Sequence, residues 1–324
     1  MTDINNIQDT FVIDAIDSKI WNWYELVAFL VAKQGRHVRL EIQEGLCLEA
    51  AGVYQLLDLF KFKSVGISTL NMVEQHDRYK VKLNPACLDY FKLSTEVDYQ
   101  NYHIWNKKKV FGAIYARPVW SRMGLASHLY NKHLEKSMIN FRTDVNASTQ
   151  RKTFELTQLF EVDSTSTENF MTMQEKLPIL IDDKDTYTLG GTAQSHTDQL
   201  KNFYANFLID IVAETYTNGR SFYVTEKTTR PMLMKKPFIV HGSKCFLIHL
   251  RQMGFRTFND FWNEDYDGYS PDIKYHKILQ LIDHLATLDL TQLDAMYKNM
   301  QTVLDHNYNL LITQSYSPQV TYVA

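Results

Sequence analysis

Two apolar runs separated by a polar segment place the strongest constraint on how this chain folds. Residues Phe207–Ala213 and Lys236–Val240 each have the length and character of a buried strand, and between them lies the run Tyr223-Val-Thr-Glu-Lys227. Parallel strands that are covered on both faces are typically short apolar runs of this kind. Open α/β sheets bind ligands beyond the carboxyl ends of their strands. An acid and a base held between two core strands therefore indicate a ligand site.

The second part of the chain continues this alternation of strands and helices. We expect further strands at Val110–Tyr115, Lys136–Asn140 and Leu177–Ile181, with helices from Ser121 to His133 and from about Thr149. Strands that alternate with helices favour a mainly parallel, doubly wound sheet. The fold class predicted for this part of the chain is therefore α/β.

The first hundred residues predict a smaller α/β unit. Apolar spacing indicates helices at 16–34 and Cys47–Phe60, and strands at Val38–Ile42 and Ser64–Leu70. The polar stretch Thr95–Lys109 is the candidate linker. We therefore divide the chain into an N-terminal α/β domain (1–106), a second α/β domain that carries the candidate ligand site (107–274) and two amphipathic C-terminal helices that pack back on the domains (275–324).

Composition excludes several classes of function. With 45% hydrophobic residues and a net charge of −3, the chain resembles an ordinary globular protein without a surface for nucleic acid. No apolar run reaches the ~20 residues of a transmembrane segment, and the N-terminus lacks the features of a leader peptide. Three widely spaced cysteines, Cys47, Cys87 and Cys245, favour a reducing compartment. We expect a cytoplasmic protein.

An arginine near the start of the helix at 121–133 is the first candidate ligand residue. Arg122 follows Ser121, a potential N-cap, just beyond the strand at 110–115. The free amides of a helix N-terminus together with a guanidinium suit a diphosphate. Arg117, on the preceding turn, is the competing candidate. The alternative interpretation of Arg122 is an exposed arginine in a first helical turn.

The second group of candidates follows the strand at 207–213. A carboxylate can accept hydrogen bonds from both hydroxyls of a ribose, and a nearby ammonium group neutralises the charge of phosphate oxygens. The candidates of this type are Glu214, Tyr223, Thr225, Glu226 and Lys227. Pro231 would kink a helix capped by Thr225, so the helix is expected to begin at Thr228 or Thr229 instead. The alternative is that Glu226 and Lys227 form a solvated pair.

The arrangement resembles the donor-binding half of the α1,3-fucosyltransferase family. The motif Val224-Thr-Glu-Lys227, the following Pro237-Phe-Ile-Val-His-Gly242 and the upstream strand with Arg122 carry this resemblance, which spans roughly residues 108–245. It implies a GT-B-like fold, in which two Rossmann-like domains face each other across a cleft. Residues 1–106 would then form the acceptor-side domain and residues 107–274 the nucleotide-sugar-binding domain. The resemblance further implies that Arg122 and Lys227 hold the diphosphate of the donor, that Glu226 binds the ribose, and that Tyr223 and Thr225 surround the nucleotide.

We therefore predict a glycosyltransferase that moves a sugar from a nucleoside diphosphate sugar to a glycan or another hydroxyl acceptor. The resemblance implies an inverting, metal-independent reaction with no cofactor other than this donor. An inverting transfer needs a general base for the acceptor hydroxyl. Glu44, at the end of the strand at 38–42, is the candidate base. Glu41, Glu49 and Glu74 are the alternatives, and a turn-exposed acid is the simpler interpretation of Glu44.

Two other classes of function stay open. One is a non-catalytic nucleotide-binding or scaffold module on the same fold. The other is a metal-dependent nucleotide hydrolase that uses Asp183-Lys-Asp185, although this run is also typical of a solvated acidic turn. The histidines show no HExxH or HxH spacing, so the sequence predicts no metal site.

Overall fold

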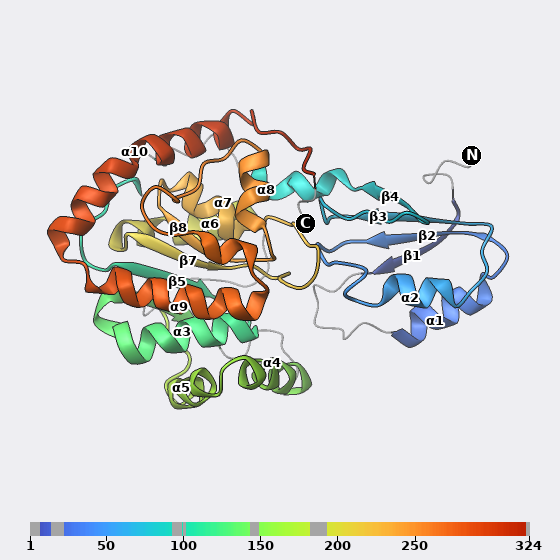
Figure 1. The fold of residues 1–324 in the computed structure, drawn as a ribbon, viewed down its shortest axis with the longest axis horizontal. Coiled ribbons are helices and arrows are strands. Elements are labelled where there is room, and N and C mark those ends of the chain that lie inside the picture. Colours follow the sequence, from blue (N-terminus) through green and yellow to red (C-terminus); the bar gives the residue numbers. More distant parts are fainter. Residues whose placement is uncertain are drawn as a thin grey trace.

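The chain forms two lobes, each built around a parallel sheet of four strands (Figure 1). This computed structural model describes residues 7–13, 23–92, 99, 102–142, 149–181 and 193–321. The expected α/β class is confirmed at this level. No helix in these ranges is long and apolar enough to cross a membrane.

The N-terminal lobe has its strands in chain order, β1-β2-β3-β4. Its elements are β1 (Asp9–Ile13), α1 (Trp23–Ala32), β2 (His37–Ile42), α2 (Val53–Asp58), β3 (Ser64–Thr69), β4 (Lys80–Leu83) and the 3-10 helix η2 (Pro85–Phe91). Both α-helices lie on one face of the sheet (Figure 1). Leu40 and Ile42 are fully buried toward the helices, whereas Arg39 and Glu41 alternate onto the other face and form an ion pair there.

The C-terminal lobe has the strand order β6-β5-β7-β8. Its strands are β5 (Phe111–Tyr115), β6 (Ser137–Phe141), β7 (Ile209–Ala213) and β8 (Phe238–His241). The order reverses between β5 and β7, since β6 lies on one side of β5 and β7 on the other. Doubly wound sheets bind ligands at such a switch point, beyond the carboxyl ends of the strands. The N-terminal sheet shows no reversal among its described strands.

Helices cover both faces of the C-terminal sheet (Figure 1). On one face lie α3 (Trp120–His133) and α9 (Pro271–Thr287), with α4 (Thr149–Val162) and α5 (Ser164–Gln174) outside α3. On the other face lies α7 (Glu226–Leu233), against which α10 (Leu290–Ile312) packs. The remaining elements are η4 (Leu134–Lys136), α6 (Ala193–Leu200), η5 (Lys201–Asn206), α8 (Phe246–Gln252) and η6 (Asp265–Gly268).

Most of the predicted strands and the two C-terminal helices are confirmed, with small shifts at their ends. The predicted helix at 47–60 is too long, because α2 begins only at Val53, after turns that end at Gly52 with φ of 77°. The predicted strand at 177–181 is wrong. Only Ile179 pairs with Phe141, as an isolated antiparallel bridge. Residues 16–22 of the first predicted helix and residues 95–98, 100 and 101 of the predicted linker lie outside the described residues, and the domain limits stay a prediction.

The segment between β7 and α7 joins the two lobes. Asn71, which follows β3, accepts a hydrogen bond from the backbone N of Phe222 at 2.8 Å and donates one to the backbone O of Arg220 at 2.7 Å. Ser221 donates to the backbone O of Gly45, beyond β2. The loops that follow β2 and β3 therefore both contact this segment of the C-terminal lobe.

Close packing at Gly45 sets the distance between the lobes. A Cβ atom on Gly45 would overlap the Cβ atom and ring of Tyr223. Because a Cβ atom moves only with its backbone, Tyr223 cannot turn away by changing its rotamer. The absence of a side chain at Gly45 is therefore a requirement of this interface.

Replacing Gly45 by alanine should destabilise the contact between the lobes. We expect Gly45→Ala to lower the free energy of unfolding by about 1–3 kcal/mol, as for other overpacked sites, and thermal or urea unfolding would measure the loss. Gly268→Ala is the matched control, because a Cβ atom there meets no atom within 4 Å. Equal stability of the two variants would show that Tyr223 does not constrain Gly45.

Candidate functional site

The carboxyl ends of β5 and β7 diverge at the switch point, and Arg122 lies between them. Pairing between these strands stops at Gly112 and Asp210, although both strands continue. Arg122 donates from Nε to the backbone O of Ala213 at 3.2 Å and from Nη2 to Oγ1 of Thr215 at 3.1 Å. Arg122 is only 2% exposed. Its guanidinium therefore holds the end of β7 and lies at the position where a doubly wound sheet places a ligand.

The start of α3 differs from the sequence prediction. Val119 is the N-cap, and Ser121 lies inside the first turn without a capping hydrogen bond. The backbone N of Trp120 donates to Oε2 of Glu155, from α4, at 2.9 Å. A carboxylate from the neighbouring helix thus satisfies one of the first amides of α3, which have no partner within the helix. This amide is not available to a diphosphate in the structure.

Glu214 is a buried residue that holds the start of α7 in place. It is fully buried and accepts three hydrogen bonds from the start of α7: from the backbone N and Oγ1 of Thr225, at 3.1 and 2.6 Å, and from Oγ1 of Thr228 at 2.7 Å. Buried carboxylates need such partners, because an uncompensated charge is costly. Glu214 therefore fixes the N-terminus of α7 to the end of β7, which is a positioning role.

The expected start of α7 at Thr228 or Thr229 is wrong. Thr225 is the N-cap, its Oγ1 accepts from the backbone N of Lys227, and Pro231 lies inside the helix. A proline at this position cannot donate to the carbonyl of Lys227, one turn earlier, and its ring crowds that carbonyl. The cap and the bonds to Glu214 outweigh that loss. As a result Glu226 and Lys227 occupy the first turn of α7.

Glu226 and Lys227 form an ion pair that remains partly accessible. Nζ of Lys227 lies 2.8 Å from Oε1 of Glu226, and the side chains are 19% and 13% exposed for Lys227 and Glu226. Burial raises the pKa of Glu226, but the charges of Lys227 and Arg230 outweigh it and lower the pKa to about 2. Glu226 is therefore ionised at neutral pH and able to accept hydrogen bonds from hydroxyl groups.

Glu44 reaches the C-terminal lobe from the end of β2. The hydroxyl of Tyr216 donates to Oε2 of Glu44, which is 4% exposed. The ring of Tyr223 lies 6.2 Å from that of Tyr216 and 5.9 Å from that of Tyr90, in η2. The structure therefore brings Glu44 to the interface between the lobes.

Two neighbouring tyrosines, Tyr90 and Tyr223, lie close to the acidic groups of both lobes. Burial, followed by the negative charges of Glu226, Glu44 and Glu214, raises the pKa of Tyr90 to about 12. Burial and the same carboxylates also raise the pKa of Tyr223. All three carboxylates are thus close enough to act on this pair of rings. The predicted residues Glu44, Glu214, Tyr223 and Glu226 belong to one cluster.

The alternative acids occupy other surroundings. Glu41 pairs with Arg39 on the open face of the N-terminal sheet, and Glu49 lies on an exposed turn. Glu74 accepts from the hydroxyl of Tyr54 at 2.8 Å and from Nδ2 of Asn71 at 2.8 Å. Glu74 therefore stabilises the interface rather than facing Tyr216. Asp183 and Asp185 lie outside the described residues.

Sequence reasoning missed Tyr90, Tyr216 and Thr228 as members of the site. Tyr90 lies in a 3-10 helix whose strand, β4, was not expected, and Tyr216 follows Thr215 on a segment without secondary structure. Thr228 was considered only as a helix start. Its spacing of three from Thr225 was the available signal, because residues at i and i+3 lie on one face of a helix.

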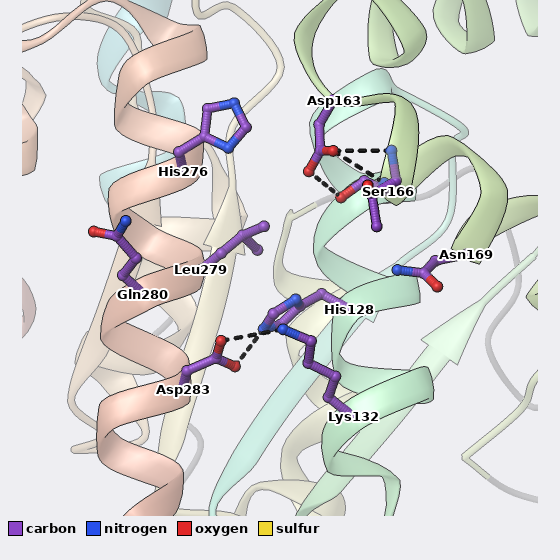
Figure 2. A pocket seen from close by; sticks show the side chains of 10 residues that line it. His128, Lys132, Asp163, Ser166, Asn169, His276, Leu279, Gln280 and Asp283 are labelled. Carbon is purple, nitrogen blue, oxygen red and sulfur yellow. Dashed lines mark hydrogen bonds and ion pairs between the residues drawn. The ribbon is translucent and has the colours of Figure 1, made fainter.

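The pocket shown in Figure 2 lies away from this cluster. It is on the outer side of the C-terminal lobe, between α3, α5 and α9, and has a volume of about 210 Å³. Its lining includes His128, Asp163 and Asp283. Pockets that enclose drug-sized ligands usually measure about 300–1,000 Å³. This one suits water or a small ion better than a nucleotide sugar.

Comparison with known proteins adds no family assignment. No protein-family model matches the chain, and no curated protein matches it significantly.

The depressed pKa of Glu226 predicts a specific dependence of stability on pH. The pKa is about 2 in the folded chain against an ordinary 4.5, so ionised Glu226 stabilises the fold above pH 4.5, and this contribution is lost as the pH falls toward 2. We expect Glu226→Gln to be less stable than the parent by about 3 kcal/mol at pH 6 and by about 1 kcal/mol at pH 3.

Urea denaturation at both pH values measures this difference. Lys227→Met serves as a companion variant, because removing the ammonium should raise the pKa of Glu226 and likewise make stability less dependent on pH. A gap between Glu226→Gln and the parent that stays the same at pH 6 and pH 3 would contradict the assignment.

Proposed function

We propose that this protein is a glycosyltransferase of the GT-B type that uses a nucleoside diphosphate sugar, with inverting, metal-independent transfer to a hydroxyl acceptor. The observation that carries the proposal is the meeting of Glu44, from the N-terminal lobe, with the first turn of α7 around Tyr216 and Tyr223. Both sheets direct the carboxyl ends of their strands toward this region. A transfer reaction needs residues that bind the donor and a residue that activates the acceptor, and two lobes that meet can supply both.

On the donor side, Lys227 and Glu226 are the groups best able to meet a nucleotide. They lie at the N-terminus of α7, where backbone amides favour an anion, and both side chains are partly accessible. Lys227 would neutralise the diphosphate, and Glu226 would accept from the ribose hydroxyls. Arg122 would support the same diphosphate from the switch point, at the cost of a hydrogen bond to Ala213 or Thr215.

On the acceptor side, Glu44 would remove the proton from the attacking hydroxyl. Its carboxylate is held by Tyr216, so its orientation is fixed before an acceptor arrives. The departing nucleoside diphosphate gains negative charge during the reaction, and Lys227 with Arg122 would stabilise this charge. The base and the leaving-group cations thus come from opposite lobes.

Calorimetry with a panel of nucleoside diphosphates, with and without Mg²⁺, tests the donor class. The proposal expects one nucleotide to bind the intact chain with an affinity that does not depend on the metal. Binding that requires Mg²⁺ would favour a metal-dependent hydrolase. Binding without transfer to any hydroxyl acceptor would favour a nucleotide-binding scaffold.

Lys227→Ala should weaken binding of the preferred nucleoside diphosphate about 10- to 100-fold. This range corresponds to a charge-assisted hydrogen bond of about 1.5–3 kcal/mol. The matched control is Lys244→Ala, because Lys244 is an exposed lysine on the loop between β8 and α8. A folded Lys227→Ala protein with unchanged affinity would remove Lys227 from the site.

Glu44→Gln should separate chemistry from binding. Because Glu44 is proposed to act only on the acceptor proton, the variant should keep nucleotide affinity and lose about 10²–10⁴-fold in turnover. Glu226→Gln should instead weaken nucleotide binding. Full transfer activity in Glu44→Gln would place the base elsewhere, and Tyr216→Phe, which removes the hydrogen bond to Glu44, would then have no effect on turnover.

A further inference from the structure

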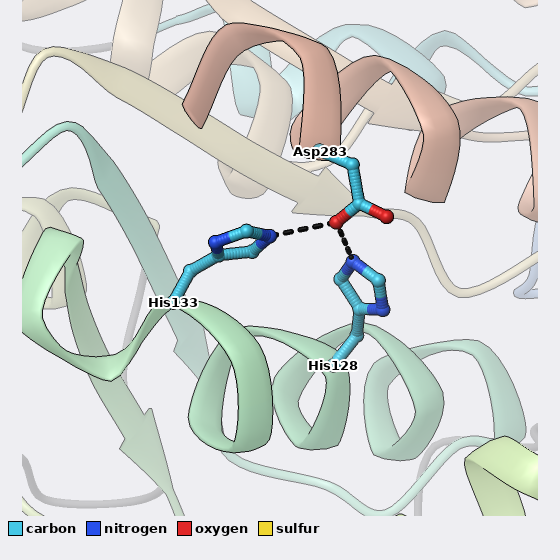
Figure 3. A group of neighbouring side chains, drawn as sticks. All are labelled: His128, His133 and Asp283. Atoms are coloured by element: carbon cyan, nitrogen blue, oxygen red, sulfur yellow. Dashed lines mark hydrogen bonds and ion pairs between the residues drawn. The ribbon is translucent and has the colours of Figure 1, made fainter. Parts of the chain in front are cut away.

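A second cluster of polar side chains lies on the outer side of the C-terminal lobe, at the end of α3. His128 and His133 of α3 both direct Nε2 toward Asp283 of α9, as Figure 3 shows. Each Nε2 atom lies 2.7 Å from the same carboxylate oxygen, Oδ1. One ligand atom from each of the three residues lies within 4.8 Å of the others. Two imidazole nitrogens and one carboxylate oxygen therefore converge on one point.

The surroundings of the cluster favour a fixed geometry. The side chain of His128 is 5% exposed and that of His133 is 16% exposed, whereas Asp283 is 40% exposed. The rings of the two histidines are 5.5 Å apart and inclined at 60°, so they approach the carboxylate from different directions. Both helices are held by the sheet beneath them, and α3 packs against α9. The three ligand atoms are therefore placed by rigid elements, as a metal site requires.

We propose that His128, His133 and Asp283 bind a divalent transition-metal ion of the zinc type and thereby connect α3 to α9. Imidazole nitrogen and carboxylate oxygen are ordinary ligands of Zn²⁺, and three protein ligands leave one position of a tetrahedral site open. Metal–ligand distances are about 2.0–2.2 Å. The two rings need to move only slightly away from Oδ1 for an ion to enter between the three atoms.

The pocket in Figure 2 supplies the fourth position. It is lined by His128 and Asp283 together with polar groups of α5, including Ser166 and Asn169, and its volume of about 210 Å³ suits water or a small anion. Asp163 is not a competing ligand, because its carboxylate accepts from the backbone N atoms of Thr165 and Ser166 at the start of α5. The open position therefore faces the pocket and not a further protein carboxylate.

Lys132 is the one described cation that competes directly with a metal ion at Asp283. Its Nζ lies 3.3 Å from Oδ2, whereas both histidines contact Oδ1. The side chain of Lys132 is 54% exposed, so it can move into solvent when an ion binds. Removing its charge should favour the metal, since like charges repel across such short distances.

Metal binding to the full chain is the direct test. After treatment with EDTA, the protein should bind one Co²⁺ per chain with the visible absorption of a tetrahedral ion, and Zn²⁺ should displace it. Asp283→Asn and His133→Gln keep the approximate shape of each side chain, and each should weaken binding at least about tenfold. His276→Ala is the matched control, because His276 lines the same pocket on α9 but is exposed and donates to the backbone O of Val162.

Two further measurements sharpen the result. Lys132→Gln should tighten Zn²⁺ binding several-fold, which a purely structural role of the cluster would not produce. Zn²⁺ at about 100 times its Kd should raise the Tm of the parent by about 4 °C, but not that of Asp283→Asn. Absence of stoichiometric binding, or equal losses in His276→Ala and Asp283→Asn, would overturn the proposal. Neither result depends on sugar-transfer activity.

Discussion

The side chain of Asn71 is the contact on which the arrangement of the two lobes depends. It is 1% exposed, and it bonds to both backbone groups that flank Ser221 while also donating to Glu74. A buried amide that lost these partners would be left with unsatisfied polar groups, which costs more than the bonds themselves contribute. The segment after β7 is therefore held by the N-terminal lobe. Glu44 and the start of α7 keep their relative positions for the same reason.

Polar residues near the end of a strand can either bind a ligand or hold parts of the protein together. The sequence alone did not distinguish these two roles. Glu214 and Lys227 both looked like ligand residues, yet the structure gives Glu214 three internal donors and complete burial. Lys227 keeps 19% of its side chain exposed. The difference arises from hydrogen-bond partners in the next helix, Thr225 and Thr228, whose side chains turn back onto the strand end. Lys227 can therefore meet a ligand more readily than Glu214, and only coordinates show this difference.

The sequence predicted the buried strands better than the exposed ones. Strands β5, β7 and β8 are mostly apolar and buried at every position, so length and apolar character identified them. By contrast, β1 and β4 are short, only partly buried and flanked by polar residues, and they were missed. The pairing of Glu44 with Tyr216 joins positions 172 residues apart. No local pattern encodes such a contact, since it arises from the packing of one lobe on the other.

The cluster of His128, His133 and Asp283 at the end of α3 also could not be recognised from the sequence. His128 and His133 are five residues apart, which is neither the HExxH nor the HxH spacing, and Asp283 is supplied by a helix 150 residues later. Arg122 lies in the first turn of the same helix α3, roughly 16 Å from His133 at 1.5 Å per residue. Arg122 is already held by Ala213 and Thr215. A metal ion at the far end of α3 therefore has no differential contact with a nucleotide-bound state, and by linkage it should change the stability of the lobe without changing nucleotide affinity.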